Sequence, residues 1–389
     1  FEDVTVLDLT HALAGPMATQ YLGALGAEVV KVEPPGGEPF RGVVNGSMFT
    51  AGNHGGKQSL SLDLKTDDGR EVAKELAAKA DVIVESFRPG VVEKFGLDYD
   101  SVTEFNDDVI YCSITGFGQD GPYSEYPAYD PIAQAMSGLM SMTGYEDRPP
   151  VRVGASPIDC GTGTMAAFLI SAALMNRAVT GEGEHIDVSL LEVAVSWMGY
   201  WVADYTGTGE QPQRSGQGFG GLAPHGVFHA DGTDPFYLSA YHDSSFEHLV
   251  DVIGRSELAT DDRFNDVESR WEHRESLKSE LEATFDDWSR DSLLETLSEA
   301  NIPTGPVQSV DALLEDPHLE ERDMLTESYN PHLDTDVQTA KAPFVTTEGR
   351  PEFEEEPPRA GEHTREVLAA MGYSEDEVDQ LVDAEIAYE

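Results

Sequence analysis

Basic residues are scarce in this sequence. It contains 24 Lys and Arg against 73 Asp and Glu, which gives a formal net charge of −49 over 389 residues. An excess of this size would repel nucleic acids and anionic membranes, so neither is expected as a partner. The acidic residues are spread along the chain and are not gathered in a tail. This distribution indicates a surface adapted to very high salt, where charge repulsion is screened over about 3 Å at 1 M.

Cysteines and long apolar runs are scarce as well. Cys112 and Cys160 are the only cysteines and form no CxxC pair, so neither a disulfide framework nor a structural zinc site is indicated. The longest apolar stretch, 165–175, is interrupted by Ser171 and is shorter than the roughly 20 residues needed to cross a bilayer. Since no signal or transit segment precedes the first strand pattern, we expect a cytoplasmic protein. The chain begins at Phe1, so a few leading residues are expected to be missing.

Common cofactor and hydrolase motifs are missing too. The sequence has no P-loop, GxSxG or HExxH. Two stretches, starting at Gly161 and Gly216, fit GxGxxG or its Ala variant. A dinucleotide-binding fingerprint must follow a strand and also open a helix, and neither stretch meets both conditions. Nicotinamide binding is therefore not expected. His225 and His229 have the spacing of a helical metal pair, yet "GVFHA" alternates like a strand, which would separate them by about 13 Å. No metal site is therefore predicted.

The N-terminal half alternates strand and helix patterns. "VTVLDLT", a helix carried by 18–25 and a strand over 27–32 form a βαβ unit with a parallel strand pair. A second unit consists of "QSLSLDL", a helix over 67–80 with Thr66 as N-cap, and "DVIVESF". "DVIYCSITGFG" supplies a further strand. This half is therefore predicted to be α/β.

The remaining segments are more varied, and the length predicts two domains. A long helix is expected to begin near Gly161, followed by a strand and an apolar helix. A glycine-rich linker over 206–226 leads to a hairpin, an acidic helical region over 245–300 and a return to α/β. Two short helices end the chain, the second opened by a capping box of Ser374 and Glu377.

Positive charge is concentrated in one part of the chain. Residues 31–94 contain nine basic and ten acidic residues, so nearly all of the net charge lies outside them. Such a near-neutral stretch in an acidic protein is a candidate site for a phosphate-bearing ligand. Ordinary pairing of Lys with Glu on helix surfaces would produce the same count, and this alternative stays open.

Asp159 is the only formal charge between Val153 and Asn176. An ionised carboxylate among small and apolar neighbours is costly unless something compensates it. One interpretation is a helix N-cap. The other is a nucleophile or base that is kept ionised by the N–H groups of a helix start, which lower its pKa. Asp130, which follows Tyr129 at the start of another apolar helix, allows the same two interpretations; paired carboxylates could also hydrolyse glycosides.

Nine ordered segments resemble the class III CoA-transferases, the family that includes formyl-CoA transferase and, as a side branch, alpha-methylacyl-CoA racemase. The resemblance covers nearly the whole chain. The segments are "VLDLTHALAGPMATQYLGALGAEVVKVEPP", "SLDLKTDDGR", "VESFRPGVVEKFGLDYD", "YCSITGFGQDGPY", "YDPIAQAMSG", the Asp159 segment, "APHGVF", "IPTGPVQSVDALLEDPHLEERDML" and "GEHTREVLAAMGY".

The resemblance implies a catalytic role for Asp159. In these transferases the matching aspartate attacks a thioester and carries first an acyl anhydride and then a CoA thioester. Tyr129 and Asp130 match positions that line the acyl pocket, and the loop with Gly216, Gly218, Gly220 and Gly221 is expected to close over the site and supply oxyanion donors. The racemase branch has a histidine where this chain has Tyr129. An acyl-CoA racemase or isomerase that uses Asp159 as a base remains the alternative, with a non-catalytic CoA-binding protein as a third.

The resemblance also implies a CoA site and no tightly bound cofactor, because the CoA thioester is the substrate. The residues that match CoA contacts are His11, Ala12, Leu13, Arg41, Leu62, Lys65, Ser86, Phe87 and Arg88, most of them in the near-neutral stretch. Two positions depart from the family pattern. Asp108 stands where many members have an Arg near a CoA phosphate, and Leu13 replaces a Gln near the acyl group, which argues against oxalate as acceptor.

The family fold is α/β: a Rossmann-like large domain and a smaller α+β domain in an interlocked, ring-shaped homodimer. By this resemblance, 1–200 and 330–389 form the large domain, 223–318 the small domain, and 201–222 and 319–345 the linkers. We expect succinyl-CoA as donor and mesaconate or a similar dicarboxylate as acceptor. Candidates for binding the acceptor's distal carboxylate are Arg41, His54 and Arg152.

Overall fold

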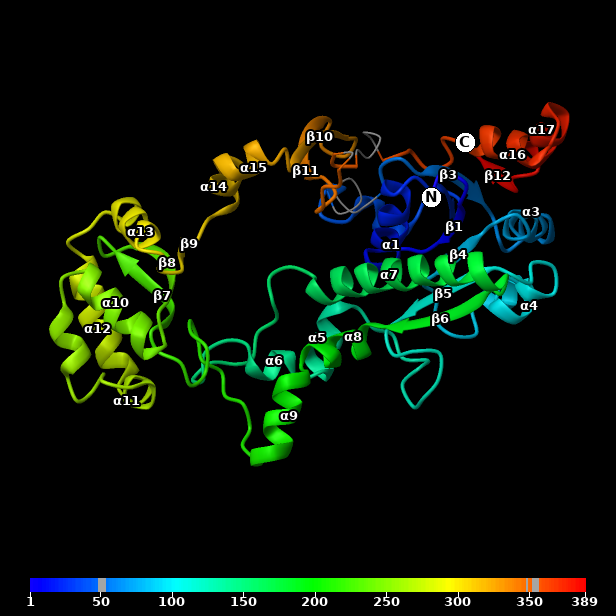
Figure 1. Cartoon of the computed structure of the whole chain (residues 1–389). Helices are drawn as coiled ribbons and strands as arrows, with labels where there is room; N and C mark the ends of the chain where they lie inside the picture. Colours follow the sequence, from blue (N-terminus) through cyan, green and yellow to red (C-terminus); the bar gives the residue numbers. More distant parts are fainter. Residues whose placement is uncertain (48–53, 348, 352–356) are drawn as a thin grey trace. The chain divides into compact units, whose positions relative to one another are not determined.

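The computed structural model describes residues 1–47, 54–347, 349–351 and 357–389. The chain folds as two compact units (Figure 1). Unit 1 comprises Phe1–Ser137, Gly154–Gly199 and Pro317–Glu389, and unit 2 comprises Gly138–Val153 and Tyr200–Asp316.

Unit 1 is built on a seven-stranded sheet with the order β12-β3-β2-β1-β4-β5-β6. The strands are β1 (Thr5–Leu9), β2 (Glu28–Glu33), β3 (Gln58–Leu62), β4 (Val82–Glu85), β5 (Ile110–Thr115), β6 (Glu184–Ser189) and β12 (Ala387–Tyr388). All neighbours pair in parallel except β12, which pairs antiparallel with β3. The chain adds strands on one side of β1 and then on the other, so the strand order reverses between β1 and β4. Ligands of open parallel sheets bind at the carboxyl ends of the strands flanking such a point.

The described part of unit 1 also contains α-helices. They are α1 (Ala14–Ala24), α3 (Asp67–Ala77), α4 (Tyr99–Thr103), α5 (Asp130–Met136), α7 (Pro157–Thr180), α8 (Leu190–Trp197), α15 (Pro317–Glu321), α16 (Thr364–Met371) and α17 (Glu375–Asp383). One core contains Leu7, Val30 and Leu60 of the sheet with α3, α16 and α17, whereas α1 and α7 pack against each other and α7 also contacts β5 and β6. Because strand side chains alternate between faces, Asp8 points away from Leu7, toward α1.

Several local predictions are confirmed, and some boundaries differ; the helix predicted over 67–80 ends at Ala77. The Thr66 hydroxyl accepts the Gly69 N–H at 3.0 Å as the N-cap of α3, and Ser374 and Glu377 form the capping box of α17. The helix expected to begin near Gly161 begins at Pro157, whose fixed φ suits the first turn of a helix. Asp159 therefore lies within the first turn of α7.

A hairpin of β10 (Leu325–Asn330) and β11 (Thr335–Ala340) occupies much of the predicted 319–345 linker. The side chains of "LTESYN" and "TDVQTA" are mostly polar, so the sequence shows no alternation of apolar and polar residues from which these strands could be predicted.

Unit 2 contains a three-stranded antiparallel sheet of β7 (His225–Ala230), β8 (Asp234–Ser239) and β9 (Thr304–Pro306), which confirms the predicted hairpin. Its helices are α6 (Leu139–Met142), α9 (Gly199–Thr208), α10 (Asp243–Val252), α11 (Val267–Glu272), α12 (Arg274–Phe285), α13 (Arg290–Glu299) and α14 (Val310–Leu314). Phe228, Phe236, Phe246, Phe264 and Phe285 lie at the centre of its core.

Residues 138–153, expected in the large domain, belong to unit 2. Arg214 explains this grouping, because its guanidinium donates to four backbone carbonyls of the segment. These belong to Ser141 (3.2 Å), Tyr145 (2.9 Å), Glu146 (3.1 Å) and Arg148 (3.1 Å).

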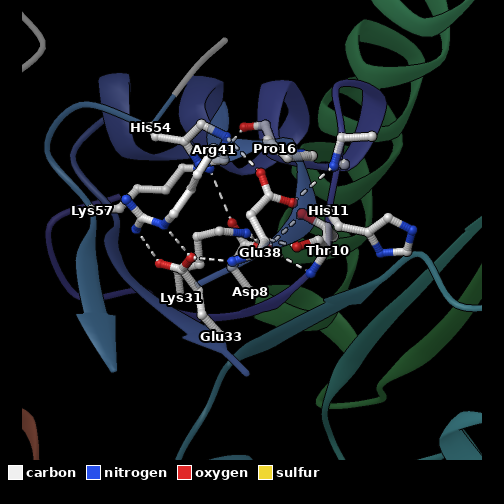
Figure 2. Close-up of polar contacts among 12 residues, drawn as sticks. Asp8, Thr10, His11, Pro16, Lys31, Glu33, Glu38, Arg41, His54 and Lys57 are labelled. Carbon is white, nitrogen blue, oxygen red and sulfur yellow. Dashed lines mark hydrogen bonds and ion pairs between the residues drawn. The ribbon is translucent and has the colours of Figure 1, made fainter. Parts of the chain in front are cut away.

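A buried charge network holds the end of β1 (Figure 2). The fully buried Asp8 carboxylate accepts hydrogen bonds from the Thr19 hydroxyl (2.7 Å) and Lys57 Nζ (3.0 Å), and from the Thr10 N–H (2.8 Å) and hydroxyl (2.6 Å). Lys31 Nζ lies 4.0 Å away. Burial alone would raise the pKa of Asp8, but Lys31, Lys57 and the two hydroxyls outweigh it and hold that pKa well below its usual range.

We expect Asp8→Asn to lower the free energy of unfolding by about 3 to 5 kcal/mol, because Lys31 and Lys57 would remain buried without a compensating carboxylate. Since the pKa of Asp8 is lowered by folding, the difference from wild type should be constant above about pH 5 and shrink as the pH falls below about 4. Urea unfolding followed by circular dichroism measures it. Asp3→Asn, at an exposed position, is the control; a loss under about 1 kcal/mol for Asp8→Asn would contradict the assignment.

Candidate active site

A cavity of about 400 Å³ opens in unit 1 at the carboxyl ends of β1, β4 and β5. Its volume is within the range of small-molecule sites, about 300 to 1,000 Å³. Its walls are the turn after β1, the loop after β4, the end of β5, the loop before α5 and the first turn of α7. Among the described residues that line it, Arg88 is the only Lys or Arg and Asp159 the only acid.

The structure brings together eight of the residues singled out from the sequence. The cavity is lined by His11, Ala12, Leu13, Ser86, Phe87, Arg88, Tyr129 and Asp159. Leu62 is instead fully buried in the core at the end of β3, and Lys65 is exposed in the turn that follows. Asp130 lies beneath the cavity wall, 1% exposed. The predicted CoA contacts of Leu62 and Lys65 remain predictions.

The three cations considered for a distal carboxylate lie outside the lining. Arg41 forms a two-point ion pair with Glu33 (2.5 and 2.7 Å) and donates to the Pro358 carbonyl at 2.9 Å. Burial lowers the pKa of His54 well below its usual range, and the nearby Lys57, Lys31 and Arg41 lower it further. Arg152 is exposed in unit 2 and donates to the Val153 carbonyl at 3.0 Å.

The start of α7 is capped by Asp130. One carboxylate oxygen of Asp130 accepts the N–H groups of Ile158 (2.7 Å) and Asp159 (3.2 Å), and the other accepts from the Gln134 amide. Two of the backbone donors that a helix start leaves unsatisfied are thereby paired with a negative charge. Asp130 therefore caps a helix 28 residues along the chain, and not the helix that it begins.

This cap overturns one expectation about Asp159. The helix N–H groups were expected to lower its pKa, but those of Ile158 and Asp159 itself are occupied by Asp130. Burial raises the pKa of Asp159, and the negative charge of Asp130 raises it further, to about 7. Asp159 is not the N-cap either, because Ser156 holds that position. The cavity therefore contains a carboxyl group that changes charge near neutral pH.

Neighbouring groups are held uncharged. Burial raises the pKa of the Cys160 thiol, and Asp159 and Asp130 raise it further, which disfavours a competing thiolate. Burial lowers the pKa of His11, and Lys31 adds to this effect. The His11 ring stacks on Phe40, at 6.5 Å between centroids, and Tyr129 meets Phe40 edge-on at 6.1 Å.

Sequence reasoning missed two contributors to the site, Phe40 and Glu85. Phe40 contacts two lining rings and lies next to Arg41, but a single aromatic residue in a loop carries no pattern. Glu85 ends β4, is 2% exposed and accepts the Phe87 N–H at 2.8 Å, which shapes the loop after β4. Burial raises the pKa of Glu85 to about 7. A polar residue that ends an apolar strand was the available signal.

The glycine-rich loop belongs to unit 2. Gly216 and Gly221 have φ values of 62° and 83°, which favour glycine. A Cβ on Gly216 would lie 2.8 Å from the Tyr145 ring, and Gly218 forms a bridge with Gly226. Gly220 lies between them in the same loop. The closure of Gly216, Gly218, Gly220 and Gly221 over Asp159 remains a prediction.

The two histidines with metal-pair spacing lie on β7, as the alternation predicts. His225 Nδ1 bonds the Ser239 hydroxyl at 2.8 Å, and His229 Nδ1 bonds Glu282 at 3.0 Å. Within the described ranges, no three His, Cys, Asp or Glu residues are grouped so as to hold a metal ion.

Comparisons with known proteins identify a family and a fold. A family model described as CoA-transferase family III matches residues 1–364. The chain is 39% identical to an acetyl-CoA:oxalate CoA-transferase of Acetobacter aceti, over 84% of this chain and 86% of that protein. It is 38% identical to a succinyl-CoA:mesaconate CoA-transferase of Haloarcula hispanica, over 95% and 96%. A crystal structure of a CAIB/BAIF family protein from Brucella suis matches with a TM-score of 0.84 and 34% identity, over 95% of this chain and 98% of that chain.

The coupling between the two aspartates can be tested by titration. Asp130→Asn removes a negative charge beside Asp159 but keeps an oxygen that can accept the Ile158 N–H. We expect the midpoint of Asp159 to move from about 7 to lower pH, yet to stay above the ordinary carboxyl range because burial, the larger cause, is unchanged. Carboxyl ¹³C NMR, with Asp159→Asn to assign the signal, measures the shift. An unmoved midpoint would show that Asp130 does not act on Asp159.

Proposed function

The chain belongs to CoA-transferase family III, and from this membership we propose that it transfers CoA from succinyl-CoA to a small dicarboxylic acid such as mesaconate. It is an enzyme of the transferase class, whose substrates include CoA thioesters. The observation that carries the proposal is a carboxyl group, Asp159, at the wall of a cavity that also contains the matched residues His11 to Leu13 and Ser86 to Arg88.

The first half of the proposed reaction loads Asp159 with CoA. The ionised carboxylate attacks the donor thioester carbonyl, forming an aspartyl acyl anhydride and releasing CoA thiolate. The thiolate then attacks the aspartyl carbonyl of the anhydride. An aspartyl-CoA thioester forms and the donor leaves as its free carboxylate.

The second half reverses these steps with the acceptor. The acceptor carboxylate attacks the aspartyl-CoA thioester, which gives a new anhydride and again releases the thiolate. Attack of the thiolate on the acyl carbonyl of this anhydride forms the product thioester and restores the Asp159 carboxylate. Every bond made or broken is to an acyl carbon, and no oxidant, reductant or net proton is required.

The surroundings of Asp159 support this role. A pKa near 7 leaves a substantial fraction ionised at neutral pH and makes the carboxylate more basic than an exposed one. Its partly apolar surroundings limit the water that would hydrolyse an anhydride. We assign oxyanion donation to the backbone of the loop with Gly216, Gly218, Gly220 and Gly221, and CoA binding to the lining residues with Arg88. The Rossmann-like description of unit 1 is supported by its strand order.

The acceptor assignment rests on a relative and on one substitution. One similar protein is named for mesaconate and another for oxalate. Leu13 lines the cavity where an oxalate-using relative is expected to have a Gln, which favours a larger, less polar acid. Of the cations considered for its distal carboxylate, Arg41 is paired with Glu33 and His54 is held neutral by burial. The role of Arg152, which lies in unit 2, stays a prediction.

We also propose that the enzyme works as a homodimer, interlocked as the family resemblance implies. The outer face of α7 carries exposed apolar side chains: Met165 (37% exposed), Phe168 (65%), Met175 (73%) and Val179 (86%). By length and composition α7 could cross a membrane, but its other face packs on α1 and the sheet, as a core helix does. A second copy of the chain accounts for the exposed face without a membrane.

Interlocked chains separate only when they unfold, so the dimer is reassembled by refolding from urea. Phe168→Glu places a charge in this face and should lower the fraction that reassembles as a dimer, since burying one such side chain contributes about 1.5 to 3 kcal/mol. Sedimentation equilibrium in molar KCl measures the mass. Val43→Glu, at an exposed apolar position outside α7, is the control. A wild-type protein that sediments as a monomer at micromolar concentration would refute the dimer.

The covalent steps can be trapped. Incubation with succinyl-CoA followed by hydroxylamine should convert Asp159 to a hydroxamate, detected by peptide mass spectrometry. Asp159→Asn, which keeps the shape of the side chain, should give no modification at that peptide and lose roughly 10³-fold or more in activity.

The same assay identifies the substrates. Succinyl-CoA and acetyl-CoA are paired with labelled mesaconate and oxalate at low and at molar KCl, and we expect the succinyl-CoA and mesaconate pair at molar salt to react fastest. Faster reaction of oxalate would overturn the acceptor assignment, and loss of activity in molar KCl would overturn the salt adaptation. Deuterium uptake at the α-carbon without acid exchange would indicate a racemase instead.

A further inference from the structure

The turn that joins β1 to α1 has an unfavourable backbone conformation. Ala12 has a φ of 67°, in the left-handed region that costs an L-residue about 1 to 2 kcal/mol. Ala12, His11 and Leu13 also line the cavity. A strained turn at a ligand site persists only when its surroundings hold it there.

Side chains from four segments hold this turn. The backbone of Thr10 donates to Asp8 at 2.8 Å, and its carbonyl accepts from Lys31 Nζ at 2.7 Å. The N–H of His11 donates to the Ser86 hydroxyl at 3.0 Å. The N–H of Ala12, the strained residue, donates to Glu38 Oε2 at 3.1 Å.

Glu38 differs from the other buried acids of this network (Figure 2). Asp8 accepts from Lys57 Nζ at 3.0 Å, and Glu33 is paired with Arg41. Glu38 is 4% exposed, and the imidazole Nε2 of His54 lies 3.7 Å from its Oε1. Among the described residues, Oε1 accepts no hydrogen bond. Burial accordingly raises the pKa of Glu38. The hydrogen bond that this buried carboxyl does accept comes from the N–H of Ala12.

The turn is packed against the helix that carries Asp159. A Cβ on Gly163 of α7 would lie 2.5 Å from the Ala14 carbonyl, and a Cβ on Gly15 would lie 2.4 Å from Thr10. No room is left between the start of α1 and the first turns of α7. A turn that relaxed at Ala12 would therefore change the wall of the cavity that Asp159 also lines.

We propose that Glu38 is a positioning residue for acyl-CoA binding, which acts by holding the N–H of Ala12 and thereby the 11–13 turn in its left-handed conformation. The proposal rests on the proposed function, since it assumes that the cavity takes an acyl-CoA. Glu38 is not among the residues that line the cavity.

The test is binding of CoA and succinyl-CoA, measured by isothermal titration calorimetry in molar KCl. Glu38→Ala removes the acceptor and should weaken both affinities about tenfold or more, as expected for a lost hydrogen bond to a charged group. Glu38→Gln keeps an acceptor oxygen and should weaken them by about threefold or less. Glu28→Ala, at the exposed start of β2, is the matched control.

Ala12→Gly distinguishes positioning from a general structural effect. Glycine adopts a positive φ without the steric cost, so the turn depends less on Glu38. In the wild-type background, Glu38→Ala should weaken binding about tenfold. In the Ala12→Gly background, the same substitution should weaken binding only about threefold. The trapping rate of Asp159 at saturating succinyl-CoA should change less than the affinity.

Each outcome has one meaning. If the wild type binds neither ligand, the proposed function fails. If the wild type binds and Glu38→Ala binds equally well, the positioning role fails. It also fails if Glu38→Ala weakens binding by the same factor in both backgrounds. Should Glu38→Ala not fold, the same two-background comparison is made with Glu38→Leu, which fills the space but has no acceptor oxygen, and equal factors there overturn the proposal.

Discussion

The site depends on the hydrogen bonds between the Asp130 carboxylate and the N–H groups at the start of α7. Two carboxyl groups lie close together in a partly dry place, where both cannot be charged at low cost. The helix start compensates only one of them. Asp130 receives that compensation. Burial and the neighbouring negative charge of Asp130 together raise the pKa of Asp159 to about 7. Environments that separate the pKa values of two acids in this way indicate a structural role for one acid and a chemical role for the other.

The same device recurs around the cavity. In three of its walls, the turn after β1, the loop after β4 and the first turn of α7, a backbone N–H donates to a buried carboxylate: Thr10 to Asp8, Ala12 to Glu38, Phe87 to Glu85 and Ile158 to Asp130. These acids are unlike the many exposed ones that make the chain so negative, because each is tied to a particular amide. A backbone segment that is bonded to a buried charge changes conformation only at a high cost in free energy. Such rigidity suits a site that holds a reactive ester in one geometry.

The sequence predicts what is local. The βαβ units, the Thr66 cap and the Ser374 capping box depend on residues a few positions apart, and all were found as expected. The cap of α7 joins residues 28 positions apart, so local reasoning supplied the helix N–H groups but not the acid that occupies them. That omission reversed the expected direction of the pKa of Asp159. The membership of 138–153 in unit 2 depends likewise on Arg214, far along the chain.

The apolar residues of 153–176 lie on two different faces of α7. One face of α7 is apolar because it packs on α1 and the sheet, and the opposite face, with Phe168 and Met175, is exposed in a single chain. Asp159, at the first turn, is only partly buried there. An anhydride needs fuller exclusion of water than this. The proposed loop closure and the proposed dimer would each supply further cover. In the proposed enzyme, closure or assembly is therefore a condition for the chemistry, because one helix carries both the nucleophile and the uncovered surface.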